Sequence, residues 1–336
     1  MTIFILLMFF SGYVNAEDDI HIFMGSDQNY VKPTTVTIAS ILKNHDGNNI
    51  NIHLYDFGMY SKSKDFLQSF CIGKGCSIEF IPFEENKRLK ICNHWLPGVF
   101  AKYWIPTDSY KRRIKKAIWL DGDTIVDGDI SELWDIDLGT NYIAGVEEIT
   151  IVTAQAALGI LRTHASLNCG VLLFNCQKMY QDNLLPRLLQ KTIELQGHTI
   201  CVEQEVLAAV TAKHRIILPP EFNFQTYHKY LDDITDIVSK TNEDSKNLAV
   251  IALQSVHKRL SHYHGILIFH YDGLFKPWRP LGAFGPYTDK WYNYLRLTPY
   301  WGFTESIKEG VATQASRIGG STIDAIAALK NITFLI

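Results

Sequence analysis

The chain has 336 residues, 47% of them hydrophobic and 20% charged, so it is long enough for one large domain or two ordinary ones and can bury a core. Its formal net charge of -3 lacks the basic excess typical of nucleic-acid-binding proteins, so we expect no nucleic-acid partner. The six cysteines include no Cys-x-x-Cys pair, which argues against a zinc site. A disulfide from Cys71 to Cys76 or Cys92 stays open if the compartment is oxidising.

The N-terminus begins with a short apolar run over residues 3–10, followed by Val14-Asn15-Ala16, an acceptable cleavage site for a signal peptide. The run is too short to span a bilayer comfortably, and no Lys or Arg precedes it. We therefore expect residues 1–16 to be a signal peptide or a short anchor. A leader would place the protein in the lumen of the secretory pathway or a membrane-associated cell envelope, and otherwise it lies on the cytoplasmic face of a membrane.

Apolar periodicity predicts strands alternating with helices along most of the chain. The expected strands cover residues 20–24, 51–55, 77–82, 116–120, 143–146, 170–175 and 266–269. The expected helices cover residues 31–44, 61–70, 100–105, 130–134, 177–196 and 203–212. Such alternation indicates an α/β fold with a mostly parallel sheet that is covered by helices on both faces.

Two carboxylates, Asp121 and Asp123, follow the apolar strand expected over residues 116–120. Ligands of open α/β sheets bind at the carboxyl ends of strands, and acids two residues apart on a strand point the same way. Their repulsion is relieved when a cation joins them, and Mg²⁺ or Mn²⁺ prefers such oxygen ligands and also binds substrate phosphates. The pair therefore predicts a site for a metal and a diphosphate.

Two other interpretations of this pair stay open. A haloacid-dehalogenase-type phosphatase also ends a strand in Asp-x-Asp-x-Thr, and Asp121 would then be its nucleophile. That class normally opens with this strand, whereas here three strand–helix units precede it, and the pair Asp232-Asp233 lies in a polar insertion. The plain structural alternative is that the two acids cap the following turn.

A second motif, Phe269-His270-Tyr271-Asp272-Gly273-Leu274-Phe275-Lys276-Pro277-Trp278, begins at the end of the last expected strand. A neutral histidine there can complete a metal shell. Gly273 allows a phosphate to approach the backbone closely, and Lys276 offers that phosphate a compact positive charge. His270 alone is more often structural, but its association with two acids, a glycine and a lysine favours a metal ligand.

Three further groups carry polar side chains near strand or helix ends. Asn168 precedes an apolar strand and either hydrogen-bonds sugar hydroxyls or starts the strand. Glu203 and Gln204 open a helix. An acid at this position interacts favourably with the helix dipole, or it binds a sugar if it lies in a cleft. In the loop after the first strand, Asp27 and Asn29 are candidates for a base or ribose, and Tyr30 for stacking. That loop is not a GxGxxG loop, which weakens a dinucleotide interpretation.

These motifs in this order resemble glycosyltransferase family 8, the retaining enzymes that include bacterial lipopolysaccharide glucosyl- and galactosyltransferases and glycogenin. The likeness runs from about Ile20 to Trp278. It implies a Mn²⁺ (or Mg²⁺) site formed by Asp121, Asp123 and His270. It also implies that the uridine is held by Asp27, Asn29 and Tyr30, and the diphosphate by Gly273 and Lys276. The donor sugar would be surrounded by Asn168, Glu203 and Gln204.

Three residues depart from the family pattern. Lys102 stands where the family usually has Arg, and it keeps the charge but loses the bidentate fork. Glu203 replaces a usual Asp, and Cys169 replaces a usual Ala. None belongs to the implied metal set. Because Lys102 and Glu203 would lie near the diphosphate and the sugar, they bear on the identity of the donor.

The resemblance implies a GT-A-like fold with a central mixed, mainly parallel sheet. It implies a retaining hexosyltransferase that moves glucose or galactose from UDP-glucose or UDP-galactose to a saccharide, lipid-linked or glycoprotein acceptor. The alternatives are the phosphatase and a non-catalytic carbohydrate-binding protein. We expect a catalytic domain over residues 17–285, with an insertion at 226–262 on the acceptor side. A helical extension over 286–336 would follow and would make peripheral membrane contact.

Overall fold

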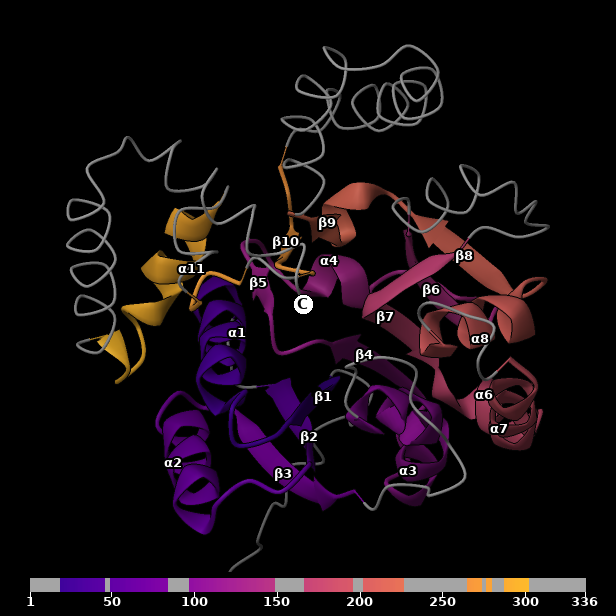
Figure 1. The fold of residues 1–336 in the computed structure, drawn as a ribbon, viewed down its shortest axis with the longest axis horizontal. Helices are drawn as coiled ribbons and strands as arrows, with labels where there is room; N and C mark the ends of the chain where they lie inside the picture. Colours follow the sequence, from indigo (N-terminus) through magenta and orange to yellow (C-terminus); the bar gives the residue numbers. More distant parts are fainter. Residues whose placement is uncertain are drawn as a thin grey trace, which may run out of the picture.

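The computed structural model describes residues 19–45, 49–83, 97–148, 166–195, 202–226, 265–273, 276–279 and 287–301 (Figure 1). Within these ranges no helix has both the length and the apolar character that a membrane span requires. The expected leader at 1–16 lies outside the described residues, as do nearly all of the insertion at 226–262, the pair Asp232-Asp233 and most of the extension at 286–336. The domain boundaries therefore stay predictions.

A seven-stranded mixed sheet forms the centre of the molecule, in the order β3-β2-β1-β4-β7-β6-β8. Strands β1 to β4 run parallel to one another, β7 runs antiparallel to both β4 and β6, and β8 is parallel to β6. The strands are β1 (Ile20–Ser26), β2 (Ile50–Asp56), β3 (Ser77–Pro82), β4 (Lys116–Leu120), β6 (Ile143–Glu147), β7 (Leu167–Asn175) and β8 (Arg215–Leu218). The predicted α/β class with a mixed, mainly parallel sheet is confirmed.

Helices cover both faces of this sheet, because its central strands bury side chains in both directions. One face packs against α1 (Val31–Asn44), α2 (Ser61–Ile72) and α4 (Ser131–Trp134). The other face packs against η2 (Pro97–Trp104), α3 (Ile105–Lys111), α6 (Cys176–Gln181), α7 (Leu184–Leu195) and α8 (Val202–Thr211). This arrangement leaves the carboxyl ends of β1 and β4 at one edge of the sheet, where the candidate residues lie.

A second, three-stranded sheet continues from the turn that follows β4. Its order is β5 (Thr124–Val126), β10 (Ile268–His270), β9 (Phe224–Gln225), and β10 runs antiparallel to β5 but parallel to β9. The short helix η3 (Pro220–Phe222) leads into β9, and α11 (Thr288–Leu295) packs its Trp291 into an apolar cluster with Ile125 and Phe269. The small sheet thereby brings the last expected strand beside the acidic turn.

The structure corrects several predicted elements. The helix expected over 100–105 is the 3-10 helix η2, and α3 follows it from Ile105, with Pro106 in its first turn. The helix expected over 177–196 is two helices, α6 and α7, separated by Asn183 at φ 51°. Strands β5, β8 and β9 were not expected. Cys71 and Cys76 are buried free thiols, whereas Cys92 lies outside the described part of the chain.

Candidate metal and donor site

The two acids lie on either side of Gly122 in the tight turn that joins β4 to β5. The backbone N–H of Asp121 donates to the Gly170 carbonyl at 2.8 Å, and the Trp119 indole donates to Asp121 Oδ1 at 2.6 Å. A Cβ atom on Gly122 would lie 2.6 Å from Thr34 Oγ1, so the turn packs closely against α1. These contacts fix the direction in which both carboxylates point.

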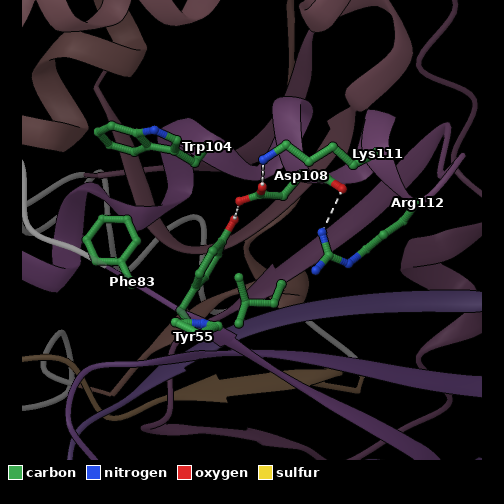
Figure 2. A pocket seen from close by; sticks show the side chains of 8 residues that line it. Tyr55, Phe83, Trp104, Asp108, Lys111 and Arg112 are labelled. Atoms are coloured by element: carbon green, nitrogen blue, oxygen red, sulfur yellow. Dashed lines mark hydrogen bonds and ion pairs between the residues drawn. The ribbon is translucent and has the colours of Figure 1, made fainter.

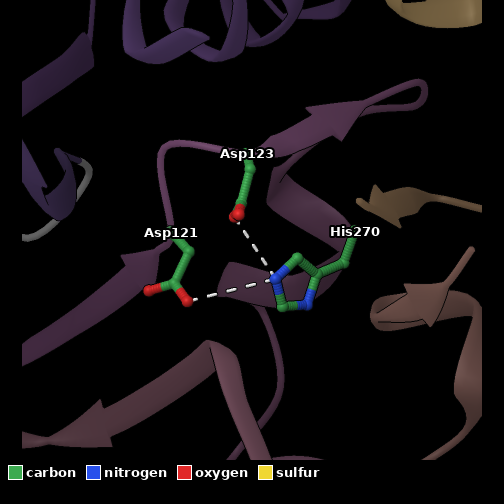
Figure 3. Close-up of side chains that lie close together, drawn as sticks. All are labelled: Asp121, Asp123 and His270. Carbon is green, nitrogen blue, oxygen red and sulfur yellow. Dashed lines mark ion pairs between the residues drawn. The ribbon is translucent and has the colours of Figure 1, made fainter. Parts of the chain in front are cut away.

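His270, the last residue of β10, faces the two carboxylates across the turn, as Figure 3 shows. Its Nε2 lies 3.3 Å from Asp123 Oδ1 and 4.0 Å from Asp121 Oδ2. One ligand atom from each of the three residues lies within 4.8 Å of the others. The structure thus brings together the three residues that the sequence predicted as metal ligands.

The ligand atoms of these three side chains suit a hard divalent cation. Asp123 Oδ1 is buried and accepts no hydrogen bond from the described residues. A buried carboxylate oxygen that accepts no hydrogen bond is costly, and a cation would offer it a partner. Two carboxylates and one imidazole suit Mn²⁺ or Mg²⁺ with sites left for phosphate oxygens. Asp121 remains about one third exposed, so the cluster is accessible from one side.

Lys276 is the nearest positive charge, with its ammonium 2.5 Å from Asp123 Oδ2 and 2.6 Å from the Tyr271 carbonyl. Burial alone would raise the pKa of Asp123, but Lys276 and His270 lower it well below its ordinary value. Burial alone would lower the pKa of His270, but the charge of Asp123 raises it. Because its pKa is lowered in this way, Asp123 is ionised at neutral pH. Burial raises the pKa of a further acid, Asp272, to about 6.

Lys102, the departure from the family's usual arginine, is buried on the opposite side of the acidic turn. Its ammonium lies 3.5 Å from Asp121 Oδ1 and 5.3 Å from the centre of the Trp119 ring. Burial opposes its charge, but Asp121 and Glu203 together raise its pKa. Burial raises the pKa of Glu203, and Lys102 opposes that effect. Lys102 and Glu203 therefore interact electrostatically.

Gln204 and Asn168 are both buried, and their described contacts are internal. Gln204 Oε1 accepts a hydrogen bond from the Cys169 backbone at 2.8 Å, so its carbonyl oxygen is already engaged. Asn168 Oδ1 accepts from the Gly170 backbone at 3.0 Å, and its amide donates to Glu148. The direct sugar contacts predicted for these residues stay predictions, while their position beside the cluster is clear.

The loop after β1 lies on the other flank. Tyr30 N–H donates to Asp27 Oδ1 at 2.8 Å, and Asn29 donates weakly to Asp27 Oδ2 at 3.4 Å. The Tyr30 ring meets Trp278 edge-on, with centroids 5.9 Å apart. A Cβ atom on Gly122 would lie 3.3 Å from Tyr30, so this ring borders the acidic turn. The nucleotide-binding role of the loop stays a prediction.

Two glycines shape the cluster. Gly273 has φ 69°, a backbone conformation that favours glycine, and it is exposed beside Lys276. Gly170 of β7 lies directly beneath the His270 ring, because a Cβ atom on it would lie 2.1 Å from His270 Cε1. Sequence reasoning treated Gly170 only as the start of a strand. No local motif pairs it with a histidine from another sheet.

Sequence reasoning also missed two polar residues at the cluster. Asn223, between η3 and β9, accepts a hydrogen bond on its Oδ1 from His270 Nδ1 at 3.1 Å. Glu148 follows β6 and is buried against Asn168. Its position as an acid directly after a strand is the signal that could have identified Glu148. No local signal marks Asn223, which lies between a 3-10 helix and a two-residue strand.

A separate hollow of about 320 Å³ lies between β2, β3, η2 and α3 (Figure 2). It is lined by aromatic rings and by two cations whose charges are balanced: Lys111 bonds to Asp108 at 2.8 Å, and Arg112 bonds to Glu79. The Tyr55 hydroxyl also donates to Asp108. None of the predicted site residues lines this hollow, so it is distinct from the metal cluster.

Comparisons with known proteins agree with this geometry. The model of glycosyl transferase family 8 matches residues 21–282. General stress protein A of Bacillus subtilis is 24% identical over 292 residues, covering 84% of this chain and 96% of that protein. Lipopolysaccharide 1,2-glucosyltransferase of Escherichia coli is 21% identical, covering 85% and 81%. The crystal structure of the galactosyltransferase LgtC with donor and acceptor sugar analogues has a TM-score of 0.67 at 19% identity, covering 83% and 96%.

The fold is that of the GT-A-like glycosyltransferases, with an Asp-x-Asp turn after β4 and a histidine brought to it by β10. The chain belongs to glycosyl transferase family 8, whose model spans most of its length. It is therefore a glycosyltransferase. The phosphatase and the non-catalytic carbohydrate-binding protein are not favoured by these findings.

Proposed function

We propose that the protein transfers glucose or galactose from a UDP-sugar to a hydroxyl of a saccharide or glycoconjugate acceptor, with retention of anomeric configuration and with Mn²⁺ (or Mg²⁺) bound. The observation that supports this most directly is the cluster of Asp121, Asp123 and His270 at the carboxyl end of β4, with Lys276 beside it. Lipopolysaccharide 1,2-glucosyltransferase is among the relatives, and LgtC is a galactosyltransferase, which supports a hexose as the transferred group.

The three ligands would hold the cation, which supplies charge neutralisation for a departing diphosphate. Lys276 uses two of its three N–H donors for Asp123 and the Tyr271 carbonyl in the described contacts, so its ammonium is already oriented. The third donor would bind a phosphate oxygen. Exposed Gly273 lets that phosphate approach the backbone, because no side chain stands in its way.

The described residues argue against a side-chain nucleophile at Gln204, because its carbonyl oxygen already accepts the Cys169 N–H. That bond fixes the orientation of the amide, and a neutral amide oxygen with one lone pair left is a poor nucleophile. We therefore favour a front-face transfer, in which the acceptor hydroxyl attacks on the side that UDP leaves. Asp27, Asn29 and Tyr30 would bind uridine, and Glu203, Gln204 and Asn168 would border the sugar.

The test is calorimetric titration of the full chain with UDP-glucose and UDP-galactose, with and without Mn²⁺, together with hydrolysis of each donor. We expect binding and hydrolysis that depend on Mn²⁺ in the wild type and are lost in Asp123→Asn. Asp65→Asn, an exposed acid on α2, serves as the matched control and should behave as wild type. Metal-independent binding of both donors would refute the metal-dependent proposal, and phosphate release from simple esters would support the phosphatase instead.

The proposal extends to location and acceptor. Residues 1–16 would direct the chain to a secretory lumen or a cell envelope, and the segments after 226 and 286 would contact a saccharide or lipid-linked acceptor. The apolar run over 3–10 and the site at Val14-Asn15-Ala16 support the first point. The mass of the mature N-terminus tests it, and a chain that retains Met1 would contradict a cleaved leader.

A further inference from the structure

A chain of buried hydrogen bonds connects His270 to residues outside the proposed ligand set. His270 Nδ1 lies 3.1 Å from Asn223 Oδ1, the Asn223 amide donates to Asn168 Oδ1 at 2.8 Å, and the Asn168 amide donates to Glu148 Oε2 at 2.8 Å. All four side chains are buried. This network, defined as His270–Asn223–Asn168–Glu148, runs from the small sheet into the large one.

The orientation of each amide in this network follows from its two ends. Asn168 lies between a backbone N–H of Gly170, which can only donate, and the carboxylate of Glu148, which accepts. Its oxygen must therefore face Gly170, and its NH₂ group must face Glu148. Because the same oxygen also faces Asn223, the group that Asn223 presents to it must be NH₂.

The orientation of Asn223 toward Asn168 also decides which of its atoms faces His270. With its NH₂ group turned toward Asn168, its oxygen faces His270 Nδ1, which must carry the proton of that hydrogen bond. In a neutral imidazole the lone pair is then on Nε2, the atom that faces both carboxylates. A histidine that donates from one nitrogen and ligates from the other is the usual arrangement at metal sites.

We propose that Asn223 is a positioning residue that holds His270 in its metal-ligating tautomer, and that Asn168 and Glu148 fix Asn223 in turn. This rests on the proposed function, because it concerns the cation that the cluster would hold. It assigns Asn168 a part in orienting a ligand, in addition to any contact with the donor sugar. It also explains why an amide side chain, which offers an acceptor and a donor at once, occupies position 223.

The test measures the Mn²⁺ affinity of the full chain by calorimetry. Electron spin-echo envelope modulation spectroscopy detects a ¹⁴N atom bound to Mn²⁺. Asn223→Leu should weaken Mn²⁺ binding about 10- to 100-fold and lose the ¹⁴N signal. Asn223→Asp keeps the acceptor for His270 but turns an oxygen toward Asn168 Oδ1 in place of NH₂, so it should keep the ¹⁴N signal and lose less Mn²⁺ affinity than Asn223→Leu. Asn44→Leu, which removes a side-chain amide with three hydrogen bonds on α1, controls for general destabilisation and should match wild type.

The far end of the network gives a second comparison that does not depend on the folding of Asn223→Leu. Glu148→Met removes the acceptor that fixes Asn168 and should weaken Mn²⁺ binding severalfold, whereas Glu148→Gln keeps an acceptor oxygen and should restore most of it. Wild-type affinity and an unchanged ¹⁴N signal in Asn223→Leu or Glu148→Met would overturn the proposal, as would equal losses in Asn223→Leu and Asn223→Asp. If His270→Ala also binds Mn²⁺ normally, the proposed metal site itself is wrong.

Discussion

Gly170→Ala provides a severe test of the metal cluster, because it adds one methyl group without changing any charge. The new Cβ atom would lie 2.1 Å from His270 Cε1, 2.6 Å from Nδ1 and 2.7 Å from Nε2. Ordinary contact between carbon atoms begins near 3.5 Å, so the ring must move by about 1 Å or more. His270 is held by Asn223 on one side and faces Asp123 on the other, so such a shift breaks the ligand geometry.

We expect Gly170→Ala to lower the free energy of unfolding by about 1–3 kcal/mol, as overpacking of a dense core does. A 1 Å misplacement at a reacting centre costs about 100-fold in rate, so hexosyl transfer should fall by at least that factor. Urea denaturation and Mn²⁺-dependent donor hydrolysis measure the two effects separately. Gly145→Ala on β6 is the matched control, because its Cβ atom would approach Leu172 Cδ2 to 2.6 Å, would make ordinary contacts with Val171 O and Leu167 Cδ2, and would not meet His270. Wild-type activity in Gly170→Ala would refute the reasoning.

Three further predictions follow from individual contacts. Lys276→Met removes the ammonium that lowers the pKa of Asp123, so Mn²⁺ binding should be lost at a higher pH than in wild type, and titrations across pH check this. Trp119→Phe removes the indole bond to Asp121, worth about 1.5–3 kcal/mol for a charged acceptor, so calorimetry should show Mn²⁺ affinity reduced about tenfold or more. Burial lowers the pKa of His53 to about 4 from 6.5, so the unfolded state takes up its proton first as pH falls. Stability should therefore decrease between about pH 6.5 and 4, by up to about 3 kcal/mol, and His53→Gln should flatten that slope in urea denaturation.

Elements with a strong apolar period were predictable from the sequence. The bounds of α1, β3 and β4 match their predictions. α1 and β4 are largely buried, and β3 alternates exposed residues with buried or partly buried ones. The shorter β5 and β9 have three and two residues, too few for any period to be visible. The break between α6 and α7 depends on Asn183 in a left-handed conformation. Asn tolerates this conformation, but the presence of an Asn does not predict it.

The metal cluster was predictable for a similar reason, and its supporting residues were not. Asp121, Asp123 and His270 each follow a strand, so their positions at one edge of a sheet can be inferred from order alone. The bond from Asn223 to His270 joins residues 47 apart in sequence, and no local pattern pairs them. Lys276 was expected to bind phosphate, but its contact with Asp123, 153 residues away, emerged only from the fold.

The division of the ligands between two sheets has a consequence for how the protein should be handled. Asp121 follows a strand of the seven-stranded sheet, whereas His270 ends a strand of the three-stranded one. A cation shared between them would cross-link distant parts of the chain, and at a concentration 100 times its Kd it would add about 2.7 kcal/mol to native-state stability. Chelators used during purification should then increase protease cleavage and amide hydrogen exchange in β9 and β10 before any change appears in β1 to β3.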